Sequence, residues 1–362
     1  MAHTKRDILF LLPYPVQVAP SQRFRVEAYF PVLEAAGLHW KCAPFFDAAG
    51  WQVLYRKGAM VQKGWAVIKG FLKRLYTTLL VAPRYRVIFV HREAAPLGPP
   101  VFEWLLSKVF RKKLIYDFDD AIWIPNVSAN NQLARRLKAF WKIGRICSYA
   151  HTVVGGNDFL CAYARQHNMS GSVVKIPTVV DTTHRYNRLQ NTTSGTVTVG
   201  WTGSHSTLPY LDAIMPVLQE LQAEIPFTFV VIADKKPSLP LQDWVFIPWS
   251  PQTEIDDLLA IHIGVMPLAS DSWSEGKCGF KLIQYLALGI PAVASPVGVN
   301  TVIIEEGING FLAATPQSWK NALRTLLEEV YLRQRMGQAG RLKVEEAYSL
   351  AAYAPVFLSL FR

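Results

Sequence analysis

Lys277 and Lys281 lie one helical turn apart at the start of a predicted helix over 280–288. The helix is preceded by Gly279, which permits a tight turn and a close backbone approach. The N-terminus of a helix presents unpaired N–H groups and the positive end of the helix dipole to an anion. Two lysines at this end suit a diphosphate better than a carboxylate, so the segment predicts a diphosphate site. An ordinary buried helix with two solvated lysines is the alternative.

A strand, a glycine turn and a helix follow one another over 196–222. Residues 196–201 alternate and are rich in β-branched side chains, which favours a strand. The turn after this strand contains Gly203, and the whole pattern is half of a nucleotide-binding βαβ unit. It lacks the G-x-G-x-x-G fingerprint of dinucleotide sites. Ser204 and His205 continue this turn, where the histidine either contacts a ligand or is simply solvated.

Three segments of the first half place polar side chains directly after a predicted strand. Ligands of open α/β sheets bind beyond the carboxyl ends of the strands, so all three segments are candidates for a site. An acidic side chain there can orient a bound ligand or accept a proton, and a D-x-D pattern can also indicate a metal site. The candidates are Ser21, Arg23 and Arg25, then His91, Arg92 and Glu93, and finally Asp117, Asp119 and Asp120.

Apolar strands alternate with helical patterns along the chain, which favours parallel sheets covered by helices, an α/β fold. A length of 362 residues with 51% hydrophobic content is enough for two domains with separate cores. A polar stretch that ends near Gly195 resembles a linker. We expect one domain over 1–190, a second over 191–345 and a C-terminal helix over 346–362.

The predicted strands cover 7–12, 86–90, 114–116, 151–154, 196–201, 227–232, 244–247, 261–266 and 291–295. The predicted helices cover 24–36, 101–110, 132–146, 280–288 and 350–362.

The chain carries a net charge of +11, and its basic residues are unevenly placed. Residues 48–92 contain no acid and nine Lys or Arg. Within them Trp65, Ile68, Leu72, Leu75 and Leu79 recur at helical spacing beside basic residues, which are Lys69, Lys73 and Arg74. A basic amphipathic helix of this kind predicts contact with an anionic membrane surface. The alternative is a surface helix whose apolar stripe packs on its own sheet, and nucleic acid is disfavoured because no binding motif accompanies the charge.

The four cysteines, Cys42, Cys147, Cys161 and Cys278, show no C-x-x-C pairing. They indicate free thiols in a reducing compartment and imply no metal site. No apolar run reaches the roughly 18 residues of a spanning helix, and the N-terminal apolar run resembles a first strand rather than a signal peptide. The sequence therefore predicts a cytoplasmic protein, peripheral at the inner face of the cell membrane.

The sequence ALGIPAVAS follows the lysine helix. With it, the segment resembles the donor-site signature of the GT-B glycosyltransferases, specifically the retaining family 4 (group 1) enzymes. In that family a helix carries two glutamates ahead of an A-x-G-x-P-V-V-A-S run. The second glutamate falls on Gln284 and the first on Gly276. The resemblance implies that Gln284 contacts the ribose hydroxyls through its amide. It also implies that the donor lies against Gly203, Ser204, His205, Lys277, Gly279, Phe280 and Lys281.

The resemblance implies a GT-B fold, which has two Rossmann-like domains with parallel sheets facing a central cleft. The first domain would bind the acceptor and the second the nucleotide sugar, and the C-terminal helix would cross back to the first domain.

The function implied is transfer of a sugar from a nucleotide-diphosphate sugar to a hydroxyl of a glycan or lipid-linked glycan, with retention, in polysaccharide biosynthesis. Lys281 would stabilise the leaving diphosphate, while His91, Asp119 and Asp120 would serve catalysis from the acceptor side. No metal and no further cofactor are expected. A sugar-nucleotide epimerase or a sugar-nucleotide-binding protein without turnover remain alternatives, whereas an NAD-dependent oxidoreductase is disfavoured by the missing glycine fingerprint.

Overall fold

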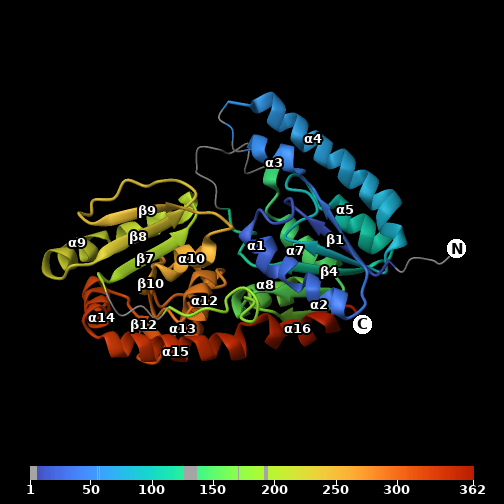
Figure 1. Ribbon diagram of the computed structural model, residues 1–362. Coiled ribbons are helices and arrows are strands. Elements are labelled where there is room, and N and C mark those ends of the chain that lie inside the picture. The colour runs from blue at the N-terminus through green and yellow to red at the C-terminus, as the bar shows by residue number, and fades with distance from the viewer. Residues whose placement is uncertain (1–5, 55, 57, 126–136, 170, 191–194) are drawn as a thin grey trace. The chain divides into compact units, whose positions relative to one another are not determined.

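The computed structural model describes residues 6–54, 56, 58–125, 137–169, 171–190 and 195–362. Contacts divide the chain into two compact units (Figure 1). Unit 1 contains Met1–Thr178 and Tyr353–Arg362, and unit 2 contains Val179–Ala352. Along the chain, unit 2 is therefore an insertion in unit 1. The division falls after Thr178, whereas the sequence suggested a boundary after 190.

Unit 1 is built on a six-stranded sheet in the order β2-β1-β3-β4-β5-β6, with every neighbouring pair parallel. Its central strands are continuous apolar runs that are buried throughout, as expected for a sheet covered on both faces. The strands are β1 (Ile8–Leu12), β2 (Trp40–Pro44), β3 (Val87–His91), β4 (Lys113–Phe118), β5 (Thr152–Gly155) and β6 (Ser172–Lys175).

The helices of unit 1 connect these strands. They are α1 (Pro20–Arg25), η1 (Glu27–Tyr29), α2 (Phe30–Ala35), α3 (Ala48–Leu54), α4 (Met60–Tyr76), η2 (Thr77–Val81), η3 (Ala82–Arg84), α5 (Val101–Trp104), η4 (Leu105–Val109), α7 (Lys142–Tyr149) and α8 (Asp158–His167).

The last helix, α16 (Leu350–Ser359), begins in unit 2 and ends in unit 1. Its Phe357 stacks on Tyr29 with ring centroids 3.9 Å apart and lies 5.9 Å from the ring of Phe89 in β3. Phe361 contacts the same ring at 6.3 Å, and Arg86 donates a hydrogen bond to its carbonyl. These aromatic contacts make the C-terminal residues part of the unit 1 core.

Unit 2 contains a second six-stranded parallel sheet in the order β12-β11-β10-β7-β8-β9. Its core joins Trp201 and Phe229 of the central strands to Leu218 and Trp319 of the covering helices. The strands are β7 (Thr198–Gly203), β8 (Thr228–Ala233), β9 (Trp244–Pro248), β10 (Ile263–Met266), β11 (Ala292–Ala294) and β12 (Gly310–Leu312). The helices are η5 (His205–Ala213), α9 (Met215–Glu224), α10 (Glu254–Leu259), α11 (Ser272–Glu275), α12 (Phe280–Ala287), α13 (Asn300–Ile303), α14 (Pro316–Glu328) and α15 (Val330–Ala347).

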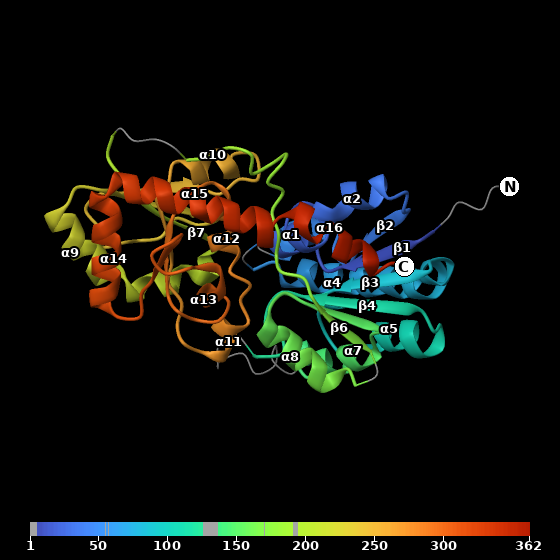
Figure 2. The ribbon, with the colours of Figure 1, turned by 90° about the horizontal axis from the view of Figure 1, so that it is seen from below.

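The helix that carries Lys281, α12, packs along α15 (Figure 2). A Cβ on Gly337 of α15 would come within 2.0 Å of the carbonyl oxygen of Gly289, just past the end of α12. Gly289 itself has a φ of 69°, the left-handed conformation that ends many helices. Small residues therefore let α15 hold the C-terminal end of α12 against the sheet.

The predicted fold class is confirmed, since both sheets are parallel and flanked by helices. The predicted helix 24–36 is wrong in detail, because the backbone breaks at Val26 (φ −126°) and Pro31 cannot donate the hydrogen bond that a continuous helix needs. The helix expected after Gly203 begins as the 3-10 turn η5. The first residues of the predicted helix 132–146 lie outside the described part of the chain.

Candidate functional site

The glycine turn after β7 lies at the carboxyl edge of the unit 2 sheet. Gly203 ends β7 and pairs with Ala233 of β8. A Cβ on Gly203 would lie 2.5 Å from the ring of Trp201 and 2.8 Å from Oγ1 of Thr207, so this position accommodates only glycine. The turn is therefore pressed against the Trp201 side chain.

Ser204 and His205, which start η5, are held by polar partners. The Oγ atoms of Ser204 and Ser206 are 2.8 Å apart. Asp234 accepts a hydrogen bond from the backbone N–H of His205 and lies 2.6 Å from its Nδ1. Burial alone would raise the pKa of Asp234, but the hydrogen bonds from His205 outweigh it and the pKa lies below its ordinary value. The sequence analysis did not single out Asp234, although its position directly after β8 is the signal that would have found it.

The N-terminus of α12 follows Gly279. This residue has φ 64° and ψ 21°, and no described side chain caps the helix there. A Cβ on Gly279 would lie 2.2 Å from Cδ1 of Ile303, so the left-handed turn and the tight packing both require glycine. The first N–H groups of α12, beginning at Phe280, therefore lie behind a turn that brings backbone close to any ligand.

Both predicted lysines lie over aromatic rings. The Nζ of Lys281 is 5.3 Å from the centroid of Trp201, the ring that also contacts Gly203. The Nζ of Lys277 is 5.7 Å from the rings of both Tyr210 in η5 and Trp273 in α11. The structure thus brings the glycine turn, η5 and the lysine segment together at one edge of the sheet. Trp201, Tyr210 and Trp273 were not predicted as site residues.

Gln284 lies one helical turn further along α12, and its surroundings differ from those of the lysines. Its side chain is buried, and Nε2 donates a hydrogen bond of 2.7 Å to the hydroxyl of Tyr186. Tyr186 belongs to the chain that enters unit 2 and is itself buried. The amide of Gln284 thus ties this entering segment to α12.

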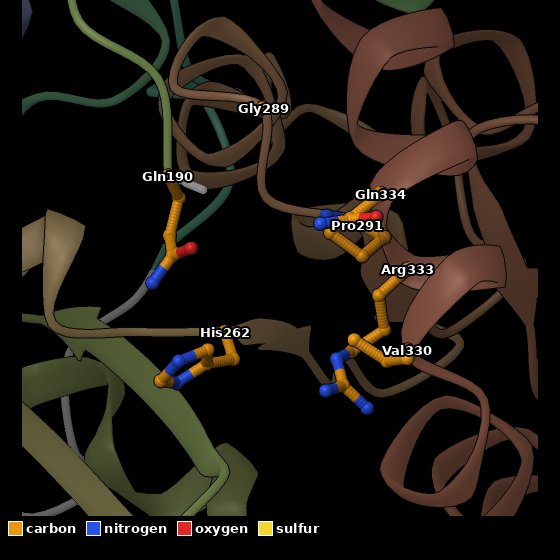
Figure 3. Close-up of a pocket in the computed structure, with 7 residues that line it drawn as sticks. All are labelled: Gln190, His262, Gly289, Pro291, Val330, Arg333 and Gln334. Atoms are coloured by element: carbon orange, nitrogen blue, oxygen red, sulfur yellow. The ribbon is translucent and has the colours of Figure 1, made fainter. Parts of the chain in front are cut away.

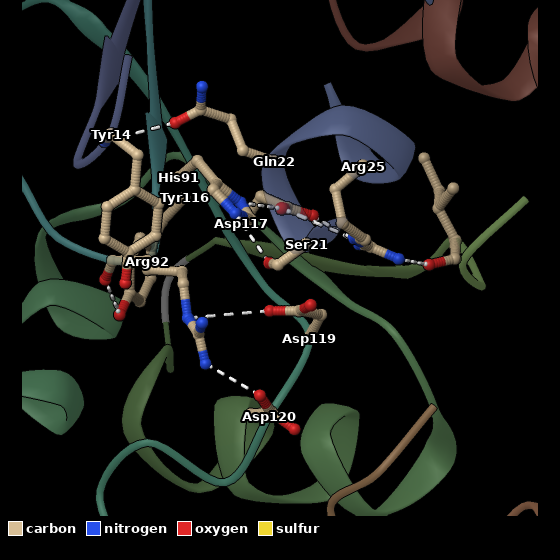
Figure 4. Close-up of polar contacts among 11 residues, drawn as sticks. Tyr14, Ser21, Gln22, Arg25, His91, Arg92, Tyr116, Asp117, Asp119 and Asp120 are labelled. Atoms are coloured by element: carbon tan, nitrogen blue, oxygen red, sulfur yellow. Dashed lines mark hydrogen bonds and ion pairs between the residues drawn. The ribbon is translucent and has the colours of Figure 1, made fainter. Parts of the chain in front are cut away.

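In unit 1, the register of the sheet places His91 of β3 beside Asp117 of β4 (Figure 4). Nδ1 of His91 lies 2.7 Å from Oδ2 of Asp117, and Nε2 lies 2.9 Å from Oγ of Ser21. Arg25 donates to both oxygens of Asp117. Because Nδ1 faces a carboxylate, it carries a proton, and Nε2 shares a hydrogen bond with the Ser21 hydroxyl.

His91 and Arg25 are buried, at 0% and 3% exposure. We predicted a catalytic role for His91, and a fully buried ring can serve such a role only through a neighbour. That neighbour is Ser21, which is half-buried. Of the other candidates in these segments, Arg23 lies over the ring of Phe24 and Glu93 pairs with Lys142 at 2.9 Å.

Arg92 organises the two remaining aspartates. Its φ of 61° is a left-handed conformation that non-glycine residues seldom adopt. The guanidinium lies 2.7 Å from Asp120 and 3.6 Å from Asp119. Burial would raise the pKa of Asp119, but the positive charge of Arg92 outweighs it and the pKa lies below its ordinary value. Each carboxylate is thus paired with a cation, and the lowered pKa makes Asp119 a weak proton acceptor.

The same pairing bears on the metal alternative for this D-x-D pattern. The guanidinium of Arg92 occupies the position beside Asp119 and Asp120 that a metal cation would need. Across the described residues, no group of three or more His, Cys, Asp or Glu side chains is arranged to hold a metal ion.

A small pocket in unit 2 lies at the opposite edge of the sheet (Figure 3). His262 precedes β10 and Pro291 precedes β11, so the pocket sits at the amino ends of these strands. Burial lowers the pKa of His262, and the positive charge of Arg333 lowers it further. Ligands of such sheets bind beyond the carboxyl ends, so this pocket is not the donor site. It is lined by Gln190, His262, Gly289, Pro291, Val330, Arg333 and Gln334.

No helix in the described ranges is long and apolar enough to cross a bilayer.

Comparison with known proteins finds a family match in the second half of the chain. The model of the group 1 glycosyl transferases matches residues 238–343. The D-inositol 3-phosphate glycosyltransferase of Corynebacterium glutamicum (strain R) is 33% identical over 109 residues, which cover 29% of this chain and 25% of that protein. The corresponding enzyme of Corynebacterium efficiens is 34% identical over 110 residues, with the same coverage. The match thus spans a quarter of the length of these curated relatives.

Solved structures resemble the whole chain. Sucrose-phosphate synthase from Thermosynechococcus elongatus has a TM-score of 0.68 at 14% identity, covering 99% of this chain and 98% of that one. HepE from Anabaena, solved in complex with UDP-glucose, has a TM-score of 0.67 at 16% identity, covering 98% and 99%. At these identities the likeness shows a shared fold. Residues 238–343 thus match the group 1 glycosyl transferase family, and the whole chain has the GT-B fold of these structures.

Proposed function

We propose that the protein transfers a sugar from a nucleotide-diphosphate sugar to a hydroxyl acceptor, with retention of configuration. The observation that carries this proposal is the position of Lys281 over Trp201, against which the Gly203 turn is pressed. A cation, a glycine turn and a helix N-terminus then converge at one sheet edge, the combination that binds a diphosphate. HepE was solved with UDP-glucose, so a uridine diphosphate sugar is the first donor to test.

The chemistry assigned to unit 2 is stabilisation of the leaving group. Breaking the bond between the anomeric carbon and the phosphate oxygen leaves negative charge on the diphosphate. Lys277, Lys281 and the first N–H groups of α12 would stabilise that charge in a preorganised site. The acceptor hydroxyl attacks the anomeric carbon on the face of the departing phosphate, and a phosphate oxygen takes its proton. This route retains configuration and needs no protein nucleophile.

The roles assigned to unit 1 concern the acceptor. Asp119 and Asp120 are paired with Arg92, so we assign them to orienting acceptor hydroxyls rather than to removing a proton. His91 is a positioning residue, because it holds Ser21 through a hydrogen bond and is itself held by Asp117. The Ser21 hydroxyl is then the member of this network that can reach an acceptor.

The acceptor we propose is a glycan or lipid-linked glycan, used at the inner face of an anionic membrane. The support is the basic, acid-free segment 48–92. Anionic lipid attracts each nearby Lys or Arg by roughly 1 kcal/mol.

A thermal-stabilisation screen of nucleoside diphosphates and their sugars tests the donor site and identifies the base. The expected result is that a diphosphate of one base raises the unfolding temperature while the nucleoside raises it little. Incubation of that sugar nucleotide with glycan acceptors should then release the diphosphate and yield an extended product with retained configuration. Lack of stabilisation by any nucleoside diphosphate would overturn the proposed donor site.

Binding without turnover is the second candidate, favoured by the departures at Gly276 and Gln284. The position of the second glutamate holds an amide that bonds Tyr186. Stabilisation by a sugar nucleotide with no transfer, hydrolysis or epimerisation of the sugar would support this reading over the transferase.

A further inference from the structure

Helix α4 and the following turn η2 present an apolar surface to solvent, at the periphery of unit 1 (Figure 1). Residues 61, 65, 68, 72, 76 and 79 follow one another at intervals of three or four, so they form one stripe along the helix. Val61 is 88% exposed, Trp65 64% and Leu72 60%. The exposed apolar set consists of Met60, Val61, Trp65, Ile68, Leu72, Leu75, Tyr76, Leu79 and Leu80.

The opposite side of α4 fixes this orientation. Arg74 is 1% exposed, and its guanidinium donates to the carbonyl oxygens of Leu12, Ala43 and Ala94 at 2.7–3.0 Å. Gly70 lies against Phe45, where a Cβ would come within 2.3 Å of the ring. Rotating the helix to bury the stripe would break three charged hydrogen bonds and this close contact. The alternative that the stripe packs on its own sheet is therefore wrong, as is the assignment of Arg74 to a basic outer face.

The charges around the stripe indicate what covers it. Residues 48–92 include no acid, and Lys69 and Lys73 flank the apolar side chains. Lys69 also pairs with Asp47 at 2.6 Å, across an exposed surface where the ion pair is weak. A second copy of this helix would bring the same lysines together with no acid on the helix itself to pair them. An anionic bilayer supplies both negative headgroups and an apolar layer, and Trp65 and Tyr76 have the amphipathic rings that favour its interface.

We propose that α4 and η2 form a membrane-docking face that lies in the plane of an anionic bilayer. Val61, Trp65, Ile68 and Leu72 enter the boundary between headgroups and acyl chains, and Lys69 and Lys73 contact lipid phosphates. This assignment rests on the membrane location proposed above, and it is independent of the transfer reaction. It adds apolar insertion to the electrostatic attraction and identifies the residues that insert.

The test uses the full chain and sedimentation with phosphatidylcholine vesicles, with and without phosphatidylglycerol. The wild-type protein should bind vesicles that contain phosphatidylglycerol and bind the neutral ones poorly. The variant Trp65→Gln/Ile68→Gln/Leu72→Gln should bind at least about a hundredfold more weakly, since each buried apolar side chain contributes about tenfold or more. A matched control is Val302→Gln/Tyr331→Gln/Leu342→Gln in unit 2, whose side chains are 57%, 82% and 59% exposed. It should bind like wild type.

A second variant separates charge from insertion while leaving Arg74 in place. Lys69→Gln/Lys73→Gln should weaken vesicle binding by about fivefold per lysine. Added salt should weaken vesicle binding by the wild-type protein. Because the replaced side chains are exposed or half-buried, each variant should unfold near the wild-type temperature, which shows that lost binding is not lost folding.

Two outcomes would overturn the assignment in different ways. If the apolar variant binds vesicles as tightly as wild type, α4 is not the docking face, although the membrane location stands. If wild type binds neither vesicle and sediments as a dimer that the apolar variant converts to a monomer, the stripe is an interface between copies. Stabilisation by a nucleoside diphosphate reports on the donor site separately in every case.

Discussion

Two side chains one turn apart on α12 have different surroundings, which determine what each can do. Lys281 lies over the ring of Trp201 at the carboxyl edge of the sheet, whereas Gln284 bonds Tyr186 inside the unit. A cation at that edge can contact a diphosphate, while an amide that is already bonded internally has to share its hydrogen-bonding capacity with any ligand.

Replacing Lys281 should therefore affect the phosphates of a nucleotide. Lys281→Ala is expected to weaken nucleoside diphosphate binding by about tenfold or more, since a hydrogen bond to a charged group contributes roughly 1.5–3 kcal/mol. Binding of the nucleoside alone should change little. Calorimetric titration measures both affinities, with Lys320→Ala on α14 as the control lysine. Equal losses for diphosphate and nucleoside would show that Lys281 does not contact phosphate.

Gln284 requires a test that separates stability from binding. Gln284→Leu should destabilise unit 2 by about 1–3 kcal/mol, because Tyr186 loses a buried hydrogen bond. In the Gln284→Leu/Tyr186→Phe double variant much of this loss should be recovered. If the amide also contacts ribose, both Gln284 variants should bind nucleotide more weakly while Tyr186→Phe alone binds normally. Nucleotide binding that follows Tyr186→Phe instead would leave Gln284 a purely structural role.

Arg92 determines whether ionised Asp119 stabilises or destabilises the folded protein. The folded-state pKa of Asp119 lies below its ordinary value of about 3.9. Ionised Asp119 thus stabilises the folded state above that pH. This stabilisation is lost as the pH falls through the folded-state pKa. In Arg92→Gln, burial should dominate and raise the pKa, so ionised Asp119 becomes destabilising near neutral pH.

The test of this pairing is the free energy of unfolding, measured between about pH 3 and pH 7. It compares wild type with Asp119→Asn, Arg92→Gln and the double variant. At neutral pH, Asp119→Asn should lower the free energy of unfolding in the wild-type background. In the Arg92→Gln background the same substitution should raise it. The same sign in both backgrounds would contradict the pairing.

At the scale of elements, α4 depends on one buried cation. Arg74→Met should reduce the free energy of unfolding by about 3 kcal/mol or more, because three carbonyl oxygens lose a charged partner. Lys73→Met, the adjacent control, should change it by less than about 1 kcal/mol. Urea unfolding of both variants gives the comparison. Similar losses for the two would mean that the Arg74 hydrogen bonds do not hold the helix.

The elements show how far the sequence could lead. Periodicity predicted most strands and the α4 stripe, because burial on a parallel sheet and helical spacing leave local patterns. It did not predict β2, an edge strand with one buried residue, or which side of α4 faces solvent. Which side of α4 faces solvent depends on Arg74, because its guanidinium binds carbonyl groups that are distant in the sequence. Likewise, Lys281 and Trp201 are far apart in the chain, and only the fold brings them together.

At the scale of the whole molecule, the two units should respond to different perturbations. Phe357→Ala removes the ring that stacks on Tyr29 and should destabilise unit 1 by about 3–5 kcal/mol. A bound nucleoside diphosphate should instead stabilise unit 2. Differential scanning calorimetry should show these shifts in separate transitions, with Ser359→Ala as the exposed control on the same helix. A single transition that responds equally to both would mean that the units unfold together.

The insertion of unit 2 between Thr178 and Tyr353 has a consequence for synthesis on the ribosome. Unit 2 is translated as one continuous segment and can fold as soon as it emerges. Unit 1 is begun first, yet it receives Phe357 and Phe361 last, after every residue of unit 2. Until then, the rings of Phe10, Tyr29 and Phe89 lack the partners that cover them. The nascent chain thus carries an unfinished aromatic surface until its last residues are translated, and such exposed surface favours aggregation.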